Sequence, residues 1–286
     1  MGLRGGPYYR TCGLALFLQA FLLVAAILSP SAATAAAQPT TRPYVLHFPG
    51  VGGVMPVDRS MLTGLVAGKV NADIQTFDWT ERDPGVHALH AYDRNQLEAA
   101  RAAEFVVARA RKYPGERLVL TSHSAGGAMA VWTLEKLPPE VKVDDVLLMA
   151  PALSPDYDLT AALRHVRGKM YVFWSSGDCF VLGFGCRLCG TMDGKYTDAA
   201  GLLGFSQPVT GDAEQYKKLD QRPYQASWVA STSLEVFFKE VAHNLMQSLN
   251  WSLVGSLVYD RHGLHALRHR AGAVYSGPMN SDQAIG

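Results

Sequence analysis

The segment from residue 118 to residue 139 constrains the fold more than any other part of the chain. Residues 118–121 form a short hydrophobic run that is typical of a buried strand, and a helical pattern from about 125 to 137 stops at Pro138-Pro139. The turn between them, SHSAGG at 122–127, consists mainly of small residues. A sharp turn from strand to helix needs small residues because the two backbones approach closely. We therefore expect a strand, a tight turn and a helix here.

Other short hydrophobic runs alternate with helical patterns along the chain. We expect further strands at 44–48, 74–79, 143–150 and 170–174, and helices at 58–69, 89–113 and 159–166. In the long helix, Leu97 and Ala103 should share the apolar face, with Glu98 on the opposite side. Buried strands that alternate with helices indicate an α/β fold with a mostly parallel sheet and helices on both faces.

Three segments that could carry chemistry each follow a predicted strand. They are residues 49–53 (PGVGG), residues 122–127, and Gly177-Asp178. In parallel sheets, sites form beyond the carboxyl ends of strands, so these segments should meet at one edge. The 49–53 loop lacks the Gly-Lys-Ser/Thr ending of a nucleotide-triphosphate loop, and its spacing does not fit a dinucleotide fingerprint.

Ser124 is the candidate nucleophile, because it stands at the centre of the 122–127 turn. We expect the backbone amides of Ala125 and Val51 to stabilise an oxyanion, the first from the positive end of the following helix. In the alternative interpretation, Ser124 only caps that helix. His123 should point away from Ser124 and be structural.

These segments together resemble the α/β-hydrolase superfamily over residues 44–178. The pattern Gly-x-Ser-x-Gly appears here with Ser122 in place of the first glycine. The stretches 47–53 (HFPGVGG), 121–127 (TSHSAGG), 148–154 (LMAPALS) and 190–194 (GTMDG) look like a group of uncharacterised exported bacterial hydrolases. The resemblance implies a compact α/β-hydrolase fold and a Ser-His-Asp triad. It implies no particular substrate.

The acid of the triad should follow a strand beyond the nucleophile. Asp178 fits this position, and its role would be to orient the histidine and stabilise the imidazolium. Asp156, after the preceding strand, is the first alternative and Asp193 is the second. An aspartate in a Ser-Gly-Asp turn can also be only a turn residue.

The histidine of the triad is harder to assign. The resemblance implies a glycine-flanked histidine shortly after a Tyr-x-x-x-Trp segment, but residues 229–241, which follow Tyr224 to Trp228, contain neither histidine nor glycine. His262 is the candidate, in a loop after a predicted strand at 253–259. His243 and His265 remain alternatives, and so does the absence of a functional histidine.

The predicted function is that of a serine esterase or lipase-like acyl hydrolase acting on a small-molecule or lipid ester, without metal or organic cofactor. The alternatives are a catalytically inactive scaffold that binds a ligand or partner, and an acyltransferase. The formal net charge of +1 gives no sign of a polyanionic partner. A small basic cluster at 265–270 indicates a solvated helix face, so we expect no nucleic acid partner.

The first 37 residues are typical of a secretory signal peptide. Arg4 and Arg10 precede an uncharged apolar run at 13–28, and a small-residue run ends at Ala37. We expect cleavage near Ala37, a linker at 38–43, a domain at 44–286 whose part from 231 is atypical, and a secreted or periplasmic location. The alternative is an uncleaved anchor that would keep the domain near the membrane.

Three cysteines, Cys179, Cys186 and Cys189, follow the strand predicted at 170–174. Cys186 and Cys189 have the spacing of metal ligands, but no second pair completes a zinc site. In an exported chain we expect a disulfide between two of the three, with three reduced thiols as the alternative.

Overall fold

The computed structural model describes residues 42–67, 70–81, 84–224 and 274–280. The chain divides into residues 1–38 and 39–286, and all the described residues belong to the second unit. The predicted signal peptide and the strand predicted at 253–259 lie outside the described residues. No helix among the described residues is long and apolar enough to cross a membrane.

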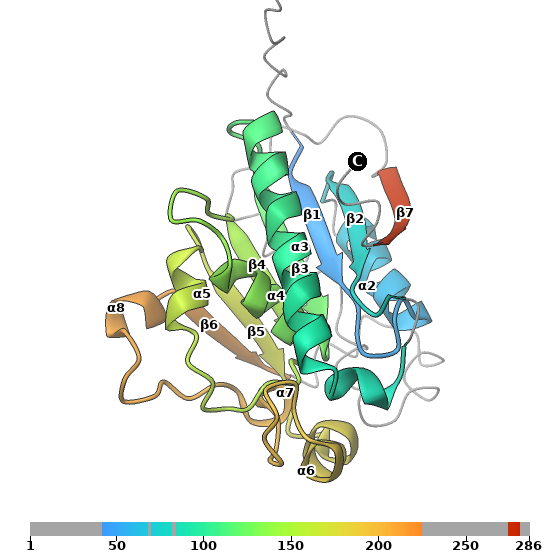
Figure 1. Cartoon of the computed structure of the whole chain (residues 1–286), viewed down its shortest axis with the longest axis vertical. Coiled ribbons are helices and arrows are strands. Elements are labelled where there is room, and N and C mark those ends of the chain that lie inside the picture. The colour runs from blue at the N-terminus through green and yellow to red at the C-terminus, as the bar shows by residue number, and fades with distance from the viewer. Residues whose placement is uncertain (1–41, 68–69, 82–83, 225–273, 281–286) are drawn as a thin grey trace, which may run out of the picture. The chain divides into compact units, whose positions relative to one another are not determined.

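The core of the domain is a parallel sheet (Figure 1). In the part of the chain that the structure describes, seven strands lie in the order β6-β5-β4-β3-β1-β2-β7, and every neighbouring pair is parallel. The strands are β1 (Tyr44–Phe48), β2 (Asp73–Asp78), β3 (Leu118–His123), β4 (Asp145–Met149), β5 (Met170–Trp174), β6 (Leu219–Pro223) and β7 (Val274–Asn280). The predicted parallel α/β sheet is confirmed, and β6 and β7 extend it beyond the strands that the sequence pattern indicated.

The strand order places a switch of direction between β1 and β3. From β1 the chain moves to β2 on one side, and it then returns to β3 on the other side of β1. The loops that leave β1 and β3 therefore diverge, and such a switch point is where open parallel sheets form their sites. The 49–53 loop and the 122–127 turn follow these two strands.

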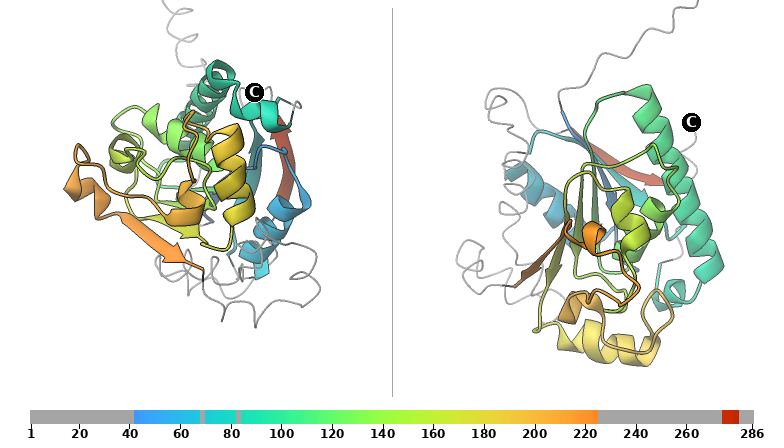
Figure 2. Two further views of the ribbon diagram at one scale, coloured as in Figure 1. Left: turned by 90° about the horizontal axis from the view of Figure 1, so that it is seen from below. Right: turned by 90° about the vertical axis from the view of Figure 1, so that its left-hand side faces the viewer.

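Helices cover both faces of the sheet, as expected. Figure 2 shows α3 (Tyr92–Lys112), α4 (Gly126–Glu135) and α5 (Thr160–Arg164) on one face, and α2 (Pro56–Ala67) on the other. A short 3-10 helix, η1 (Val86–Leu89), precedes α3. Residues 126–134 of α4 are all buried. A helix that is apolar all round is stable only in such a setting, which explains why α4 carries no polar face.

The predicted apolar face of α3 is partly wrong. Leu97 is 66% exposed, whereas Glu98 is buried together with Ala99, Ala102 and Ala103. Alanines occur on both sides of this helix, so periodicity alone could not separate the two faces. Small side chains allow a close approach to the neighbouring layer, and Glu98 is accommodated by an ion pair of 2.8 Å with Arg101.

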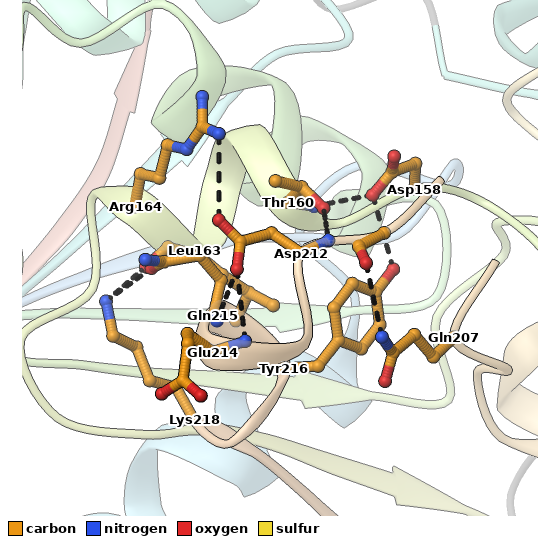
Figure 3. Close-up of polar contacts among 11 residues, drawn as sticks. Asp158, Thr160, Leu163, Arg164, Gln207, Asp212, Glu214, Gln215, Tyr216 and Lys218 are labelled. Atoms are coloured by element: carbon orange, nitrogen blue, oxygen red, sulfur yellow. Dashed lines mark hydrogen bonds and ion pairs between the residues drawn. The ribbon is translucent and has the colours of Figure 1, made fainter. Parts of the chain in front are cut away.

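Between β5 and β6 the chain forms short helices: the π-helical η2 (Cys179–Gly185), α6 (Cys186–Cys189), α7 (Ala200–Leu203) and α8 (Ala213–Tyr216). Polar contacts between α5 and α8 hold this region to the domain (Figure 3). The Tyr216 hydroxyl accepts a hydrogen bond of 2.9 Å from the amide of Leu159, and the amide of Asp212 donates one of 3.0 Å to the Thr160 hydroxyl. Because α8 leads directly into β6, these contacts place β6 beside β5.

The three cysteines of this region are free thiols, so the predicted disulfide is not present. Cys179 is exposed while Cys186 is buried. Burial raises the pKa of the Cys186 thiol to about 12. Among the described residues no group of His, Cys, Asp or Glu side chains is arranged so that it could hold a metal ion.

Candidate active site

Ser124 lies in the turn between β3 and α4 with a backbone φ of +52°. This left-handed conformation is uncommon for a residue with a side chain, and it persists only when its surroundings enforce it. The amide of Ser124 donates a hydrogen bond of 2.8 Å to the carbonyl of Met149, at the end of β4. The Ser124 carbonyl accepts hydrogen bonds from the amides of Gly127, at 2.9 Å, and Ala152, at 3.1 Å. Three hydrogen bonds thus hold Ser124 in its strained conformation.

The two glycines that follow Ser124 are required by close packing. A Cβ atom on Gly126 would lie 2.2 Å from the carbonyl oxygen of Phe48 and 2.4 Å from that of Pro49. A Cβ atom on Gly127 would lie 2.8 Å from the Cβ atom of Pro151. The start of α4 therefore packs directly on the end of β1, which explains the small residues that the sequence shows here.

Ser122 occupies the position of the first glycine in the commoner pattern. It is fully buried, and its hydroxyl donates a hydrogen bond of 3.3 Å to the carbonyl of Leu147 in β4. A hydroxyl that is satisfied in this way can be buried at little cost. The departure from the commoner pattern is therefore compatible with the turn.

The 49–53 loop lies beside Ser124. A Cβ atom on Gly50 would be 3.4 Å from the Cβ atom of Ser124 and 3.1 Å from Nδ1 of His123. A tight turn shapes the loop, in which the amide of Gly53 donates a hydrogen bond of 3.0 Å to the carbonyl of Gly50, and Gly53 has a φ of +68°. The two segments that sequence analysis paired are thus in contact.

Carbonyl groups of the 49–53 loop are held by hydrogen bonds. The Pro49 carbonyl accepts one of 2.8 Å from the indole nitrogen of Trp79, and the Val51 carbonyl accepts one of 2.9 Å from the amide of Gly85. Within residues 42–67, 70–81, 84–224 and 274–280, the amides of Val51 and Ala125 have no hydrogen-bond acceptor. Backbone amides without an acceptor, one next to Ser124 and one in the adjoining loop, are the kind of donors that can bind an oxyanion.

Asp178 lies at the same edge of the sheet as Ser124. It follows β5, which is two strands from β3, and it is fully buried. Its amide donates a hydrogen bond of 3.0 Å to the carbonyl of Ser175, and Asp178 then leads into η2. Asp178 is therefore a buried carboxyl group at the edge of the sheet where Ser124 lies.

The two alternative acids have other partners. Asp156 is mostly exposed and forms an ion pair of 2.8 Å with Lys195. Asp193 accepts hydrogen bonds from the amide of Ser154, at 2.9 Å, and from the hydroxyl of Thr191, at 2.7 Å, and it also contacts the Ser154 hydroxyl. These contacts tie the 190–194 segment to the loop that follows β4.

The three candidate histidines, His243, His262 and His265, lie outside the described residues. The strand β6 ends at Pro223, and the amide of Tyr224 donates a hydrogen bond of 2.8 Å to the carbonyl of Trp174 at the end of β5. The chain thus leaves β6 at the edge that holds Ser124 and Asp178. Any histidine that completes a triad would have to reach this edge.

A buried cluster beside the site was missed by sequence reasoning. Asp58, in the first turn of α2, contacts His47 at 3.1 Å and His123 at 3.5 Å, and all three side chains are almost fully buried. Burial acts to raise the pKa of Asp58, but the contacts with His123 and His47 outweigh it and hold this pKa well below its usual range. We call these three residues the Asp58 cluster. An acidic residue in a first helical turn is normally interpreted as a cap, so its sequence position gave no sign of this role.

Comparison with protein-family models and with curated proteins gives no match. Among solved structures, the chain is similar to the crystal structure of the esterase domain from a Rhodothermus marinus protein. The two are 15% identical in sequence, the match covers 78% of this chain and 88% of the esterase domain, and the TM-score is 0.40. This is a distant likeness.

Proposed function

We propose that the protein is a serine hydrolase of the α/β-hydrolase type that cleaves carboxylic esters, with Ser124 as its nucleophile. The observation that carries the proposal is the strained turn at Ser124, where φ is +52°, beside the free amides of Val51 and Ala125 at the switch point of the sheet. A protein keeps such strain where the exact placement of a side chain matters. A serine that only capped a helix would not need it.

In the proposed reaction the hydroxyl oxygen of Ser124 attacks the ester carbonyl, and a histidine takes the hydroxyl proton. The amides of Val51 and Ala125 stabilise the negative charge on the tetrahedral oxygen. The bond to the alcohol then breaks, the histidine returns its proton to the leaving alcohol, and an acyl group stays on Ser124. A water molecule releases the acid by the same steps. Asp178 orients the histidine, for which His262 is our first candidate.

Labelling with a fluorophosphonate tests the proposal, because this reagent reacts with serines that have an activated hydroxyl. We expect the parent protein to be labelled at Ser124, as shown by peptide mapping, and Ser124→Ala to lose both labelling and ester hydrolysis. Ser122→Ala is a matched control, because it removes a buried hydroxyl only two residues away. It should still be labelled.

Two outcomes would favour the other candidate functions. If the folded parent protein is not labelled, an inactive scaffold that binds a ligand becomes the better interpretation. If labelling occurs but added alcohols are acylated faster than water, the protein is an acyltransferase. Labelling of the Ser124→Ala variant at the rate of the parent would refute the assignment of the nucleophile.

A further inference from the structure

The carboxylate of Asp58 joins three segments that surround Ser124. Its Oδ2 atom accepts a hydrogen bond of 2.8 Å from the amide of Met55, which ends the connection from the 49–53 loop to α2. Its Oδ1 atom lies 3.1 Å from Nε2 of His47, in β1, and 3.5 Å from Nδ1 of His123, in β3. One buried carboxylate therefore contacts residues before the loop, after the loop and next to the nucleophile.

The two histidines extend these contacts to the site itself. Nδ1 of His47 lies 3.0 Å from the hydroxyl of Thr121, which ties β1 to β3 one residue before β1 ends and two residues before β3 ends. The ring of His123 lies against Gly50, because a Cβ atom there would be 3.1 Å from its Nδ1 atom. His123 thus fills the space between Asp58 and the loop that carries Val51.

The Asp58 cluster is built to be rigid. Its three side chains are at most 6% exposed, so any movement of one would leave a buried polar group without its partner. Such a loss costs the full desolvation of the group, and the cost is higher when the group is charged. A single arrangement of the 49–53 loop relative to Ser124 is therefore favoured before any substrate binds.

We propose that Asp58, acting through His123 and His47, is a positioning residue that holds the 49–53 loop at a fixed distance from Ser124. The inference rests on the proposed function, because its effect is to place the Val51 amide where the oxyanion forms. Preorganised donors stabilise a transition state because they need no rearrangement during the reaction. Loss of Asp58 should therefore slow the reaction more than it weakens the binding of substrate.

The test compares Asp58→Asn with Asp145→Asn in steady-state hydrolysis of a p-nitrophenyl ester by the full chain. Asp145 is a matched control, because it is equally buried and accepts a hydrogen bond of 2.8 Å from the Lys169 amide at the other end of β4, away from Ser124. Both variants should lower the melting temperature. At temperatures well below the melting temperature of each variant, Asp58→Asn should lower kcat at least about tenfold and keep KM within about threefold of the parent, in line with the loss of oxyanion stabilisation. Asp145→Asn should keep kcat within about twofold of the parent.

A second pair of variants covers the case in which Asp58→Asn does not fold. His123→Asn keeps a side-chain donor near the position of Nδ1, whereas His123→Leu has a similar bulk and no donor. We expect His123→Asn to retain several times the kcat of His123→Leu. Equal kcat values in these two variants would overturn the inference.

The failure of the inference and that of the proposed function can be told apart. If the parent protein hydrolyses the ester through Ser124 and Asp58→Asn keeps kcat within about twofold, only the positioning role is refuted. If the parent and Ser124→Ala are equally inactive, the proposed function is refuted, and the positioning role falls with it.

Discussion

Substitution of Gly126 by alanine tests the packing on which the candidate site depends. The added Cβ atom would lie 2.2 Å from the Phe48 carbonyl oxygen and 2.4 Å from that of Pro49, where an ordinary contact is 3.4 Å or more. Both obstacles are backbone atoms, so no rotamer change can relieve the clash. The end of β1 and the start of α4 must separate by roughly 1 Å, by the spacing of ordinary packing contacts.

The expected magnitude follows from two opposing effects. Overpacking of this kind costs about 1–3 kcal/mol, and the lower entropy of the unfolded chain with alanine returns about 0.4–1 kcal/mol. We expect a net loss of about 1–2 kcal/mol in the free energy of unfolding, measured by urea denaturation. Because the 49–53 loop follows β1 directly, a shift of this size should also slow fluorophosphonate labelling of Ser124 by up to about 100-fold.

Gly185→Ala is the matched control for Gly126→Ala. Gly185 has helical angles, with φ −60° and ψ −46°, and among the described residues a Cβ atom there would meet only the Phe180 carbonyl oxygen, at 3.5 Å. The same chemical change should leave labelling unchanged and stabilise the protein by up to about 1 kcal/mol. If Gly126→Ala were as stable as the parent and labelled at the same rate, the proposed contact between α4 and β1 would be refuted.

Ser124→Gly should be more stable than Ser124→Ala by about 1 kcal/mol in urea denaturation, because glycine adopts a φ of +52° without strain, and equal stability would argue against a strained turn. Burial raises the pKa of Glu98 to about 7, which means that the fold favours the protonated side chain. The stabilisation that protonated Glu98 provides is therefore full below the ordinary pKa of glutamate and is lost as the pH rises through 7. Between pH 5 and pH 8 the parent should therefore lose up to about 3 kcal/mol of stability that Glu98→Gln does not lose, and parallel pH profiles would contradict this. Iodoacetamide should alkylate Cys179 rapidly in the native protein and Cys186 only after denaturation, whereas recovery of a Cys179–Cys186 disulfide peptide would contradict the free thiols.

Local patterns in the sequence were sufficient for the central part of the domain. The strands predicted at 44–48 and 170–174 have the observed bounds of β1 and β5, and the predicted strand, turn and helix around Ser124 are all present. Buried parallel strands are continuously hydrophobic, and a tight turn after a strand requires small residues, so both features leave a local trace. The contact between the 49–53 loop and Ser124 followed from them, because parallel strands end at a common edge.

The sequence pattern did not indicate the two edge strands of the sheet. The strand β6 has the sequence LDQRP and β7 has VYSGPMN, and neither shows the apolar run of a buried strand. An edge strand has one neighbour and borders solvent, so polar residues, glycine and proline are tolerated there. Contacts made elsewhere in the chain, such as those of α8 with α5, decide that β6 pairs with β5.

The central strands and the tight turn at Ser124 were therefore determined by the sequence itself, whereas the surroundings of Ser124 were decided by the tertiary structure. Asp58 reaches His123 across 65 positions in the chain, and the burial of Glu98 in place of Leu97 depends on which side of α3 meets the next layer. Local patterns record hydrophobicity and turn geometry within about ten residues. A buried carboxylate gains its role only when folding excludes water and brings distant donors to its oxygen atoms.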